Sequence, residues 1–137
     1  MATDTDYSHR SSVQKLGVKP DDRLEVAGDV GAPLRRDLKE TIGRGFVRSG
    51  ELDGAVVMVE SLEDGERCLA EYRPRIRDTG YLWLLTRKRG HENYINQMLL
   101  VPRAKQLGLI DNKTCSIDDT RSAIRFVVPR ALRKKTG

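Results

Sequence analysis

The chain has 137 residues, of which 33% are charged, 38% hydrophobic and 5% aromatic. This length fits one domain of ordinary size and excludes a catalytic domain joined to a separate substrate domain. No apolar run approaches the roughly 20 residues that span a bilayer, so no membrane partner is expected. The formal net charge of +5 is uneven, because residues 1–70 carry a net −4 and residues 71–137 a net +9. The second half therefore indicates either an anionic partner or a solvated basic surface.

Few side chains suit metal or redox chemistry. Cys68 and Cys115 are too far apart for a CxxC motif, and we expect both to be buried, reduced thiols. His9 and His91 are the only histidines. The sequence therefore predicts no metal site.

The two ends of the chain are polar. Residues 1–10 lack the apolar centre of an export signal, so we expect a cytoplasmic protein. The predicted organisation is a flexible tail over residues 1–10, a single α/β domain over residues 11–130 and a basic tail over residues 131–137.

The first elements are a short helical turn, a strand and a helix. Residues 13–18 suit the turn and residues 24–27 the strand. Leu34, Leu38 and Ile42 then recur every four residues, which places one apolar stripe on a helix.

A second strand and helix follow. Residues 55–59 are a continuous apolar run, typical of a strand covered on both faces. Ser61 precedes Glu63 and Asp64, and acids are favoured in the first turn of a helix. Pro74 must bend or end this helix.

The second half predicts a further strand, an interrupted helix and a hairpin. Residues 78–80 suit a turn before an apolar strand over residues 81–86. From residue 94 the pattern fits a helix that Pro102 interrupts, so we expect a kink or two short helices. Strands over residues 113–117 and 123–128 have no room for a crossover between them and must be antiparallel neighbours.

This order predicts a small three-layer Rossmann-like α/β fold. Its sheet should be mostly parallel, with helices on both faces, right-handed crossovers and a C-terminal antiparallel hairpin at the edge. The strand over residues 81–86 should lie in the middle, with Trp83 in the core.

A basic loop follows that central strand. In open α/β sheets ligands bind beyond the carboxyl ends of the strands, so this loop predicts a crevice for an anion. Arginine offers a planar fork for phosphate, lysine a point charge, and tyrosine a ring for stacking. The candidate ligand-binding residues are Arg87, Lys88, Arg89, His91, Tyr94 and, from the hairpin, Arg121.

A second candidate site lies after the first strand. Gly28, Asp29 and Gly31 occupy the place of a cofactor-binding loop, but the spacing lacks the GxGxxG fingerprint. A plain strand-to-helix turn is the alternative interpretation. The identity of any cofactor is unknown from the sequence.

No residue is assigned a catalytic role. The chain contains neither a GxxxxGK[ST] phosphate loop nor a GxSxG nucleophile elbow. Glu60, Asp118 and Asp119 are acids near the expected crevice, yet paired aspartates in a hairpin loop usually cap their own turn.

Several stretches resemble the bacterial domain of unknown function 3052. They are Tyr7-Ser8, residues 13–20 (VQKLGVKP), Leu82-Trp83 before the basic loop, residues 108–120 (GLIDNKTCSIDDT) and residues 125–127 (RFV). The resemblance covers nearly the whole chain and implies a pared-down Rossmann or methyltransferase-like domain without an established activity.

Two positions depart from the family pattern, where a Trp commonly precedes the last strand and a Pro often opens the central loop. This chain has Arg121 and Arg87 there, and both add positive charge.

Three functional hypotheses follow. The first is a small, non-catalytic binding module that presents a basic crevice to an anionic ligand. The second is a degenerate methyltransferase-like or nucleotide-using enzyme with residues 28–31 as its cofactor loop. The third is an RNA- or DNA-binding protein that uses the basic second half. The oligomeric state stays open, because Leu99 and Leu100 suit a core or an interface.

Overall fold

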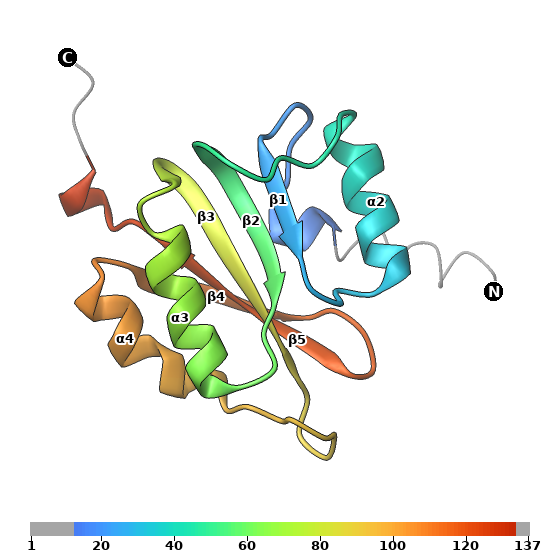
Figure 1. The fold of residues 1–137 in the computed structure, drawn as a ribbon, viewed down its shortest axis with the longest axis vertical. Coiled ribbons are helices and arrows are strands. Elements are labelled where there is room, and N and C mark those ends of the chain that lie inside the picture. Colours follow the sequence, from blue (N-terminus) through green and yellow to red (C-terminus); the bar gives the residue numbers. More distant parts are fainter. Residues whose placement is uncertain (1–12, 134–137) are drawn as a thin grey trace.

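The computed structural model describes residues 13–133, which form one sheet flanked by helices (Figure 1). The strands are β1 (Leu24–Ala27), β2 (Leu52–Met58), β3 (Ile76–Arg87), β4 (Ile110–Ser116) and β5 (Arg121–Val127). The helices are α2 (Ala32–Ile42), α3 (Leu62–Tyr72) and α4 (Val101–Gln106), with the 3-10 turns η1 (Gln97–Leu100) and η2 (Arg130–Leu132). Residues 13–16 are also helical, as predicted. The predicted tail over residues 1–10 lies outside the described residues, as do residues 134–137.

The sheet confirms the α/β class but is parallel only in part. Its strand order is β1-β2-β3-β5-β4. β1, β2 and β3 run parallel, whereas β5 lies antiparallel between β3 and β4. The antiparallel hairpin is present as predicted. Its second strand, β5, lies inside the sheet next to β3, so that β4 is the edge strand on this side. Burial explains this order, because Ile124 and Phe126 of β5 are completely buried and β4 is mostly exposed.

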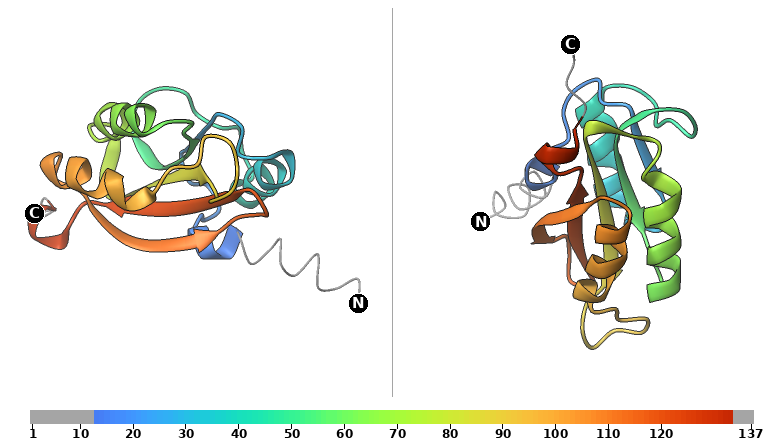
Figure 2. Two further views of the ribbon diagram at one scale, coloured as in Figure 1. Left: turned by 90° about the horizontal axis from the view of Figure 1, so that it is seen from below. Right: turned by 90° about the vertical axis from the view of Figure 1, so that its left-hand side faces the viewer.

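Helices cover both faces of the sheet (Figure 2). Leu34 and Leu38 of α2 pack on the face that carries Trp83, while Leu69 of α3 and Leu100 of η1 pack on the opposite face. The three-layer arrangement is therefore present.

The two crossovers have opposite hands. The steps from β1 to β2 and from β2 to β3 go the same way across the sheet, yet α2 and α3 lie on opposite faces. The β2–α3–β3 unit is right-handed and the β1–α2–β2 unit is left-handed (Figure 1), against the expectation of right-handed connections. The long connection after α2 accommodates this path, and the Val47 amide donates a hydrogen bond to the Leu24 carbonyl of β1.

The turn predicted over residues 78–80 is wrong. β3 is continuous there, with Ile76 paired to Leu52 and Tyr81 paired to Gly54, so the intervening residues bulge against a single residue of β2, Asp53. A Cβ on Gly80 would lie 2.6 Å from the Asp53 carbonyl oxygen. Glycine therefore permits a bulge at a position that by sequence resembles a turn.

The interrupted helix is confirmed, but it starts later than predicted. Tyr94 lies before the helix and bridges through its backbone to Arg87. Asn96 caps η1, because its side chain accepts a hydrogen bond from the Met98 amide. The two short helical segments η1 and α4 meet next to Pro102, so the expected break is present.

The two cysteines are free, but only one is buried. Burial raises the pKa of Cys68 in α3 to about 11, so this thiol stays protonated at neutral pH. Cys115 in β4 is half-buried, because β4 is the edge strand.

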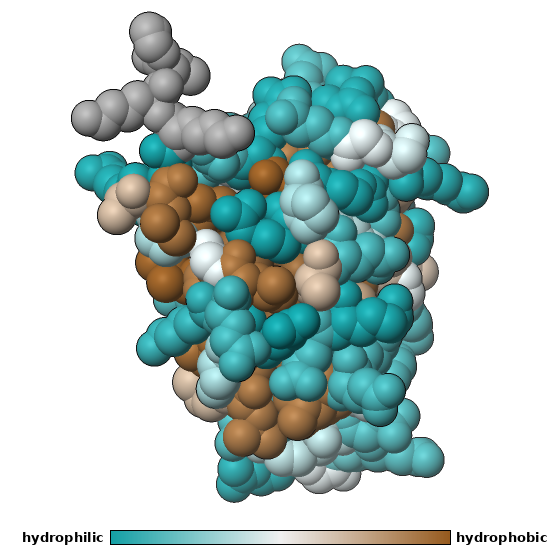
Figure 3. All heavy atoms as spheres, turned by 60° about the vertical axis from the view of Figure 1, so that its left-hand side comes forward, coloured by the Kyte–Doolittle hydropathy of each residue, from teal (hydrophilic) through white to brown (hydrophobic). Residues whose placement is uncertain are grey.

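Figure 3 shows exposed apolar side chains on one face of the molecule, where hydrophilic side chains interrupt them. Leu99 is 54% exposed, whereas Leu100 belongs to the core. The other large exposed apolar residues are Tyr94, Met98, Ile110 and Leu132. Between residues 13 and 133, no helix has the length and hydrophobicity to cross a membrane.

Candidate functional site

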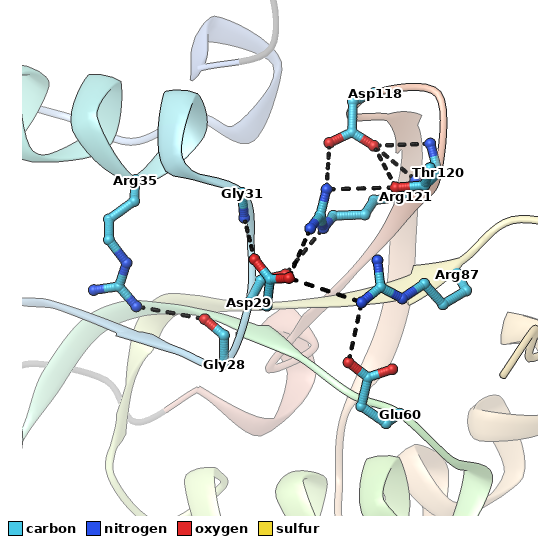
Figure 4. Close-up of polar contacts among 9 residues, drawn as sticks. All are labelled: Gly28, Asp29, Gly31, Arg35, Glu60, Arg87, Asp118, Thr120 and Arg121. Atoms are coloured by element: carbon cyan, nitrogen blue, oxygen red, sulfur yellow. Dashed lines mark hydrogen bonds and ion pairs between the residues drawn. The ribbon is translucent and has the colours of Figure 1, made fainter. Parts of the chain in front are cut away.

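Charged side chains from four segments meet where the parallel strands β1, β2 and β3 end, which we call the edge with Arg87 and Arg121 (Figure 4). β1, β2 and β3 are parallel, so their carboxyl ends share this edge, where Asp29, Glu60 and Arg87 lie. β5 runs the other way and therefore begins here with Arg121, which follows Asp118 in the hairpin loop. The fold thus joins residues as distant in sequence as Asp29 and Arg121, which are 92 positions apart.

Two glycines shape the loop after β1. Gly28 and Gly31 have φ angles of 77° and 94°, in the region that side chains with a Cβ rarely adopt. A Cβ on Gly28 would lie 3.0 Å from the Cβ of Met58, and one on Gly31 would lie 3.4 Å from Nη1 of Arg121. The loop therefore packs against β2 and against a guanidinium, and it leaves no open glycine cradle.

Arg121 fastens this loop to the hairpin. Its Nε donates a hydrogen bond to the carbonyl oxygen of Asp29 at 2.9 Å, and its Nη2 lies 3.1 Å from Oδ2 of the same residue. Its Nη1 donates to Oδ2 of Asp118 at 2.8 Å. The side chain is only 12% exposed, so the guanidinium is held in a fixed orientation.

Arg87 lies directly opposite Arg121 in the antiparallel ladder of β3 and β5. Like charges at such positions destabilise a sheet unless anions compensate them. Nη2 of Arg87 lies 3.3 Å from Oε2 of Glu60 and 3.9 Å from Oδ2 of Asp29. Within the described part of the chain, its Nε and Nη1 atoms have no hydrogen-bond partner. Arg87 therefore keeps donors that a ligand could use.

Asp118 organises the hairpin loop as an aspartate turn, the role expected for it from the sequence. Its Oδ1 accepts hydrogen bonds from the amides of Thr120 at 2.9 Å and Arg121 at 2.8 Å. Partial burial acts to raise the pKa of Asp118, but the Thr120 amide and the Arg121 side chain and amide stabilise the carboxylate. Together they hold the pKa of Asp118 below its ordinary value.

The lowered pKa predicts a pH dependence of stability. A lowered folded-state pKa stabilises the protein fully above the unfolded-state pKa, about 3.9 for aspartate, and this stabilisation disappears as the pH falls through the folded-state pKa. We expect Asp118→Asn to lower the free energy of unfolding at pH 7 by at most about 1 kcal/mol, as for a partly exposed ion pair. Urea denaturation from pH 7 to pH 3 should show the difference from wild type shrinking below about pH 4.

Asp119→Asn is the matched control, because Asp119 makes no ion pair with a described residue. It should change the free energy of unfolding little at any of these pH values. An Asp118→Asn effect that persists unchanged to pH 3 would contradict the assignment.

The other predicted anion-binding residues follow Arg87 along the loop to Tyr94. Nζ of Lys88 donates to Oγ of Ser116 at 2.6 Å, which ties the start of the loop to β4. Arg89 lies over the ring of Tyr94, 5.6 Å from its centroid, and His91 is exposed. The structure thus brings together Arg87 and Arg121, whereas the exposed side chains of Arg89 and Tyr94 contact each other.

The sequence identified the arginines but not their partners. Glu60 and Asp118 were candidate acids near a crevice, and the structure places them in ion pairs with Arg87 and Arg121. With Asp29, three carboxylates face two guanidiniums, so this edge has no excess of positive charge. No cluster of three or more His, Cys, Asp or Glu within residues 13–133 is placed to hold a metal ion.

A surface hollow of about 520 Å³ lies at the other end of α2. Its lining residues are Arg36, Lys39, Glu40, Gly43, Arg44 and Gly45. The carbonyl groups at the C-terminus of a helix disfavour anions. Arg36 in this hollow is 66% exposed, whereas Arg121 and Arg87 are 12% and 22% exposed, so the edge with Arg87 and Arg121 holds the less hydrated guanidiniums.

Comparisons with known proteins identify a family and a fold. The model of a family described as protein of unknown function (DUF3052) matches residues 13–130. No curated protein matches the sequence.

The solved structures that are similar to this chain include methyltransferases. One is an S-adenosylmethionine-dependent methyltransferase from Aquifex aeolicus, with 10% identity, a TM-score of 0.67 and coverage of 88% of this chain and 89% of that one. A further similar structure is fibrillarin from Aeropyrum pernix in complex with S-adenosyl-L-methionine, with 17% identity, a TM-score of 0.56 and coverage of 88% of this chain and 76% of that one. At these identities the similarity establishes the Rossmann-like methyltransferase fold of the chain.

Proposed function

Because the chain belongs to the DUF3052 family, which is described as protein of unknown function, we propose a function from the site: the protein is a binding module that holds an anionic small molecule between Arg87 and Arg121. The observation that carries this proposal is the pair of guanidiniums set opposite each other at the ends of β3 and β5. The pair lies beyond the carboxyl ends of the parallel strands, where α/β sheets bind ligands.

Burial and bonding support a binding role for this pair. The Arg121 and Arg87 side chains are 12% and 22% exposed, so they are less hydrated than surface cations. Arg121 is oriented by Asp118, and Arg87 keeps Nε and Nη1 donors that no described residue uses. A preorganised arginine loses little freedom when it binds, which favours bidentate recognition of an anion.

The fold favours a second candidate, a methyltransferase-like protein that binds S-adenosylmethionine or a nucleotide. The loop over residues 28–31 has the matching position after β1. However, the space over Gly31 is taken by Arg121, and Gly28 packs on Met58. The residues present do not form an open cradle for such a cofactor, so we assign no chemical step.

Ligand-dependent thermal unfolding tests the proposal. S-adenosylmethionine, ATP and inorganic phosphate serve as probes, and a bound probe at a hundredfold excess over its Kd should stabilise the protein by about 2.7 kcal/mol. Arg121→Gln should abolish the shift, and Arg48→Gln, at an exposed position outside the edge, should retain it. A shift that survives in Arg121→Gln would contradict the proposed site.

The alternative, nucleic-acid binding, is tested by measuring the RNA affinity of Arg89→Gln and Arg121→Gln at several salt concentrations. Affinity for mixed-sequence RNA should then fall steeply with salt. If Arg89→Gln loses RNA affinity and Arg121→Gln keeps it, the binding site is the exposed loop after β3 and not the edge with Arg87 and Arg121.

A further inference from the structure

The two opposed arginines share one counter-ion. Oδ2 of Asp29 lies 3.1 Å from Nη2 of Arg121 and 3.9 Å from Nη2 of Arg87 (Figure 4). Arg87 and Arg121 occupy directly opposite ladder positions, where nearby anions compensate their repulsion. Glu60 pairs with Arg87 and Asp118 with Arg121, and the carboxylate of Asp29 is the one that lies near both arginines.

The Asp29 carboxylate is the most exposed member of the group. Its side chain is 66% exposed, against 12% for Arg121 and 22% for Arg87. Among residues 13–133, its second oxygen, Oδ1, accepts a hydrogen bond only from the Gly31 amide, two residues away. The loop has another anchor, because the Asp29 carbonyl oxygen accepts the Nε hydrogen bond of Arg121. The carboxylate can therefore turn away while the backbone of the loop and Arg121 stay in place.

When the Asp29 carboxylate turns away, the charges of Glu60 and Asp118 remain and limit which anion can take its place. Without Asp29, the two guanidiniums are balanced by Glu60, 3.3 Å from Arg87, and Asp118, 2.8 Å from Arg121. A group with one negative charge restores the net charge of −1 that these five side chains, Asp29 included, carry together, whereas a phosphate monoester brings close to two negative charges. The carboxylates of Glu60 and Asp118 would repel that additional charge in a partly desolvated site.

We infer that the ligand of this edge carries a carboxylate rather than a phosphate, and that the Asp29 side chain occupies the place of the ligand's carboxylate. The inference rests on the proposed function, because it specifies the ligand of the same site. Asp29 thereby competes with the ligand, and its removal should strengthen binding even though it removes two ion pairs.

Rescue by a small carboxylate tests this inference. Sodium acetate and sodium phosphate are titrated into wild type and Asp29→Ala at constant ionic strength, with thermal unfolding and the NMR signal of the Arg121 Nε–H group as readouts. We expect Asp29→Ala to bind acetate with saturation and about tenfold more tightly than wild type, a difference of about 1.4 kcal/mol. Phosphate should bind Asp29→Ala more weakly than acetate does.

Glu51→Ala is the matched control. Glu51 is 64% exposed and pairs with Arg77 at 3.0 Å, so its removal also breaks an exposed ion pair. It should give no acetate-dependent change. Asp29→Asn, whose amide oxygen still accepts from Gly31, removes the charge while it keeps the shape of the loop, and it should bind acetate as Asp29→Ala does.

The outcomes separate the inference from the proposed function. Tighter binding of phosphate than of acetate, with an Arg121 signal that moves, would overturn the carboxylate ligand and retain the anion site. Equal acetate binding by wild type and both Asp29 variants would overturn the role of Asp29. The absence of any response to either anion in all variants, together with a negative probe panel, would overturn both.

Discussion

Trp83→Ala should lower the free energy of unfolding by about 3–5 kcal/mol, the range for removing a large aromatic side chain from a core. Trp83 is completely buried at the centre of the sheet, between Val56 of β2 and Arg125 of β5 in register. Its Nε1 also donates a hydrogen bond to the carbonyl oxygen of Leu16 at 2.8 Å, which fastens the N-terminal helical turn to the sheet. The variant therefore loses apolar contacts and an anchor of residues 13–16.

Urea denaturation followed by circular dichroism measures this effect, because Trp83 is the only tryptophan and its fluorescence is lost with it. Trp83→Phe separates the two contributions. It keeps much of the apolar volume but leaves the Leu16 carbonyl without its donor, which costs about 1–3 kcal/mol. A loss below 1 kcal/mol for Trp83→Ala would show that this side chain is not packed as described.

Gly54→Ala should also destabilise the protein, near the upper end of the roughly 1–3 kcal/mol typical of overpacking. A Cβ on Gly54 of β2 would lie 2.1 Å from the ring of Tyr81, its partner in β3. The ring has little room to move, because Tyr81 is 5% exposed and its hydroxyl donates to Oδ2 of Asp22 at 2.9 Å. The methyl group must therefore displace either the ring or the strand.

Gly45→Ala is the control for this prediction, because a Cβ there meets no atom within 4 Å and Gly45 has no positive φ. The two variants make the same chemical change, so a difference in the midpoint of urea denaturation reports the clash alone. If Gly54→Ala matches Gly45→Ala in stability, the close contact with Tyr81 does not exist in solution.

The sequence drew attention to the charged residues of the candidate site, but not to which carboxylate pairs with which arginine. The strand before Arg87 is recognisable from its apolar run, and Arg121 follows the turn residues of a hairpin. Asp29 lies in a loop whose glycines suggest a cofactor, and no local pattern shows that its carboxylate reaches the arginines. That contact depends on β5 starting at the edge where β1 ends, which is a property of the whole sheet.

Features that depend on neighbouring residues were predictable from the sequence, whereas features that depend on contacts between distant residues were visible only in the folded structure. Local patterns set the elements, because Leu34, Leu38 and Ile42 share one face of α2 and residues 55–59 bury both faces of β2 whatever lies around them. The insertion of β5 beside β3 buries Ile124 and Phe126, and the left-handed β1–α2–β2 unit places α2 on the face that carries Trp83. The bulge at Gly80 depends on the close approach of the Asp53 carbonyl of β2. These choices involve residues far apart in the chain, and they alone place Asp29 between Arg87 and Arg121.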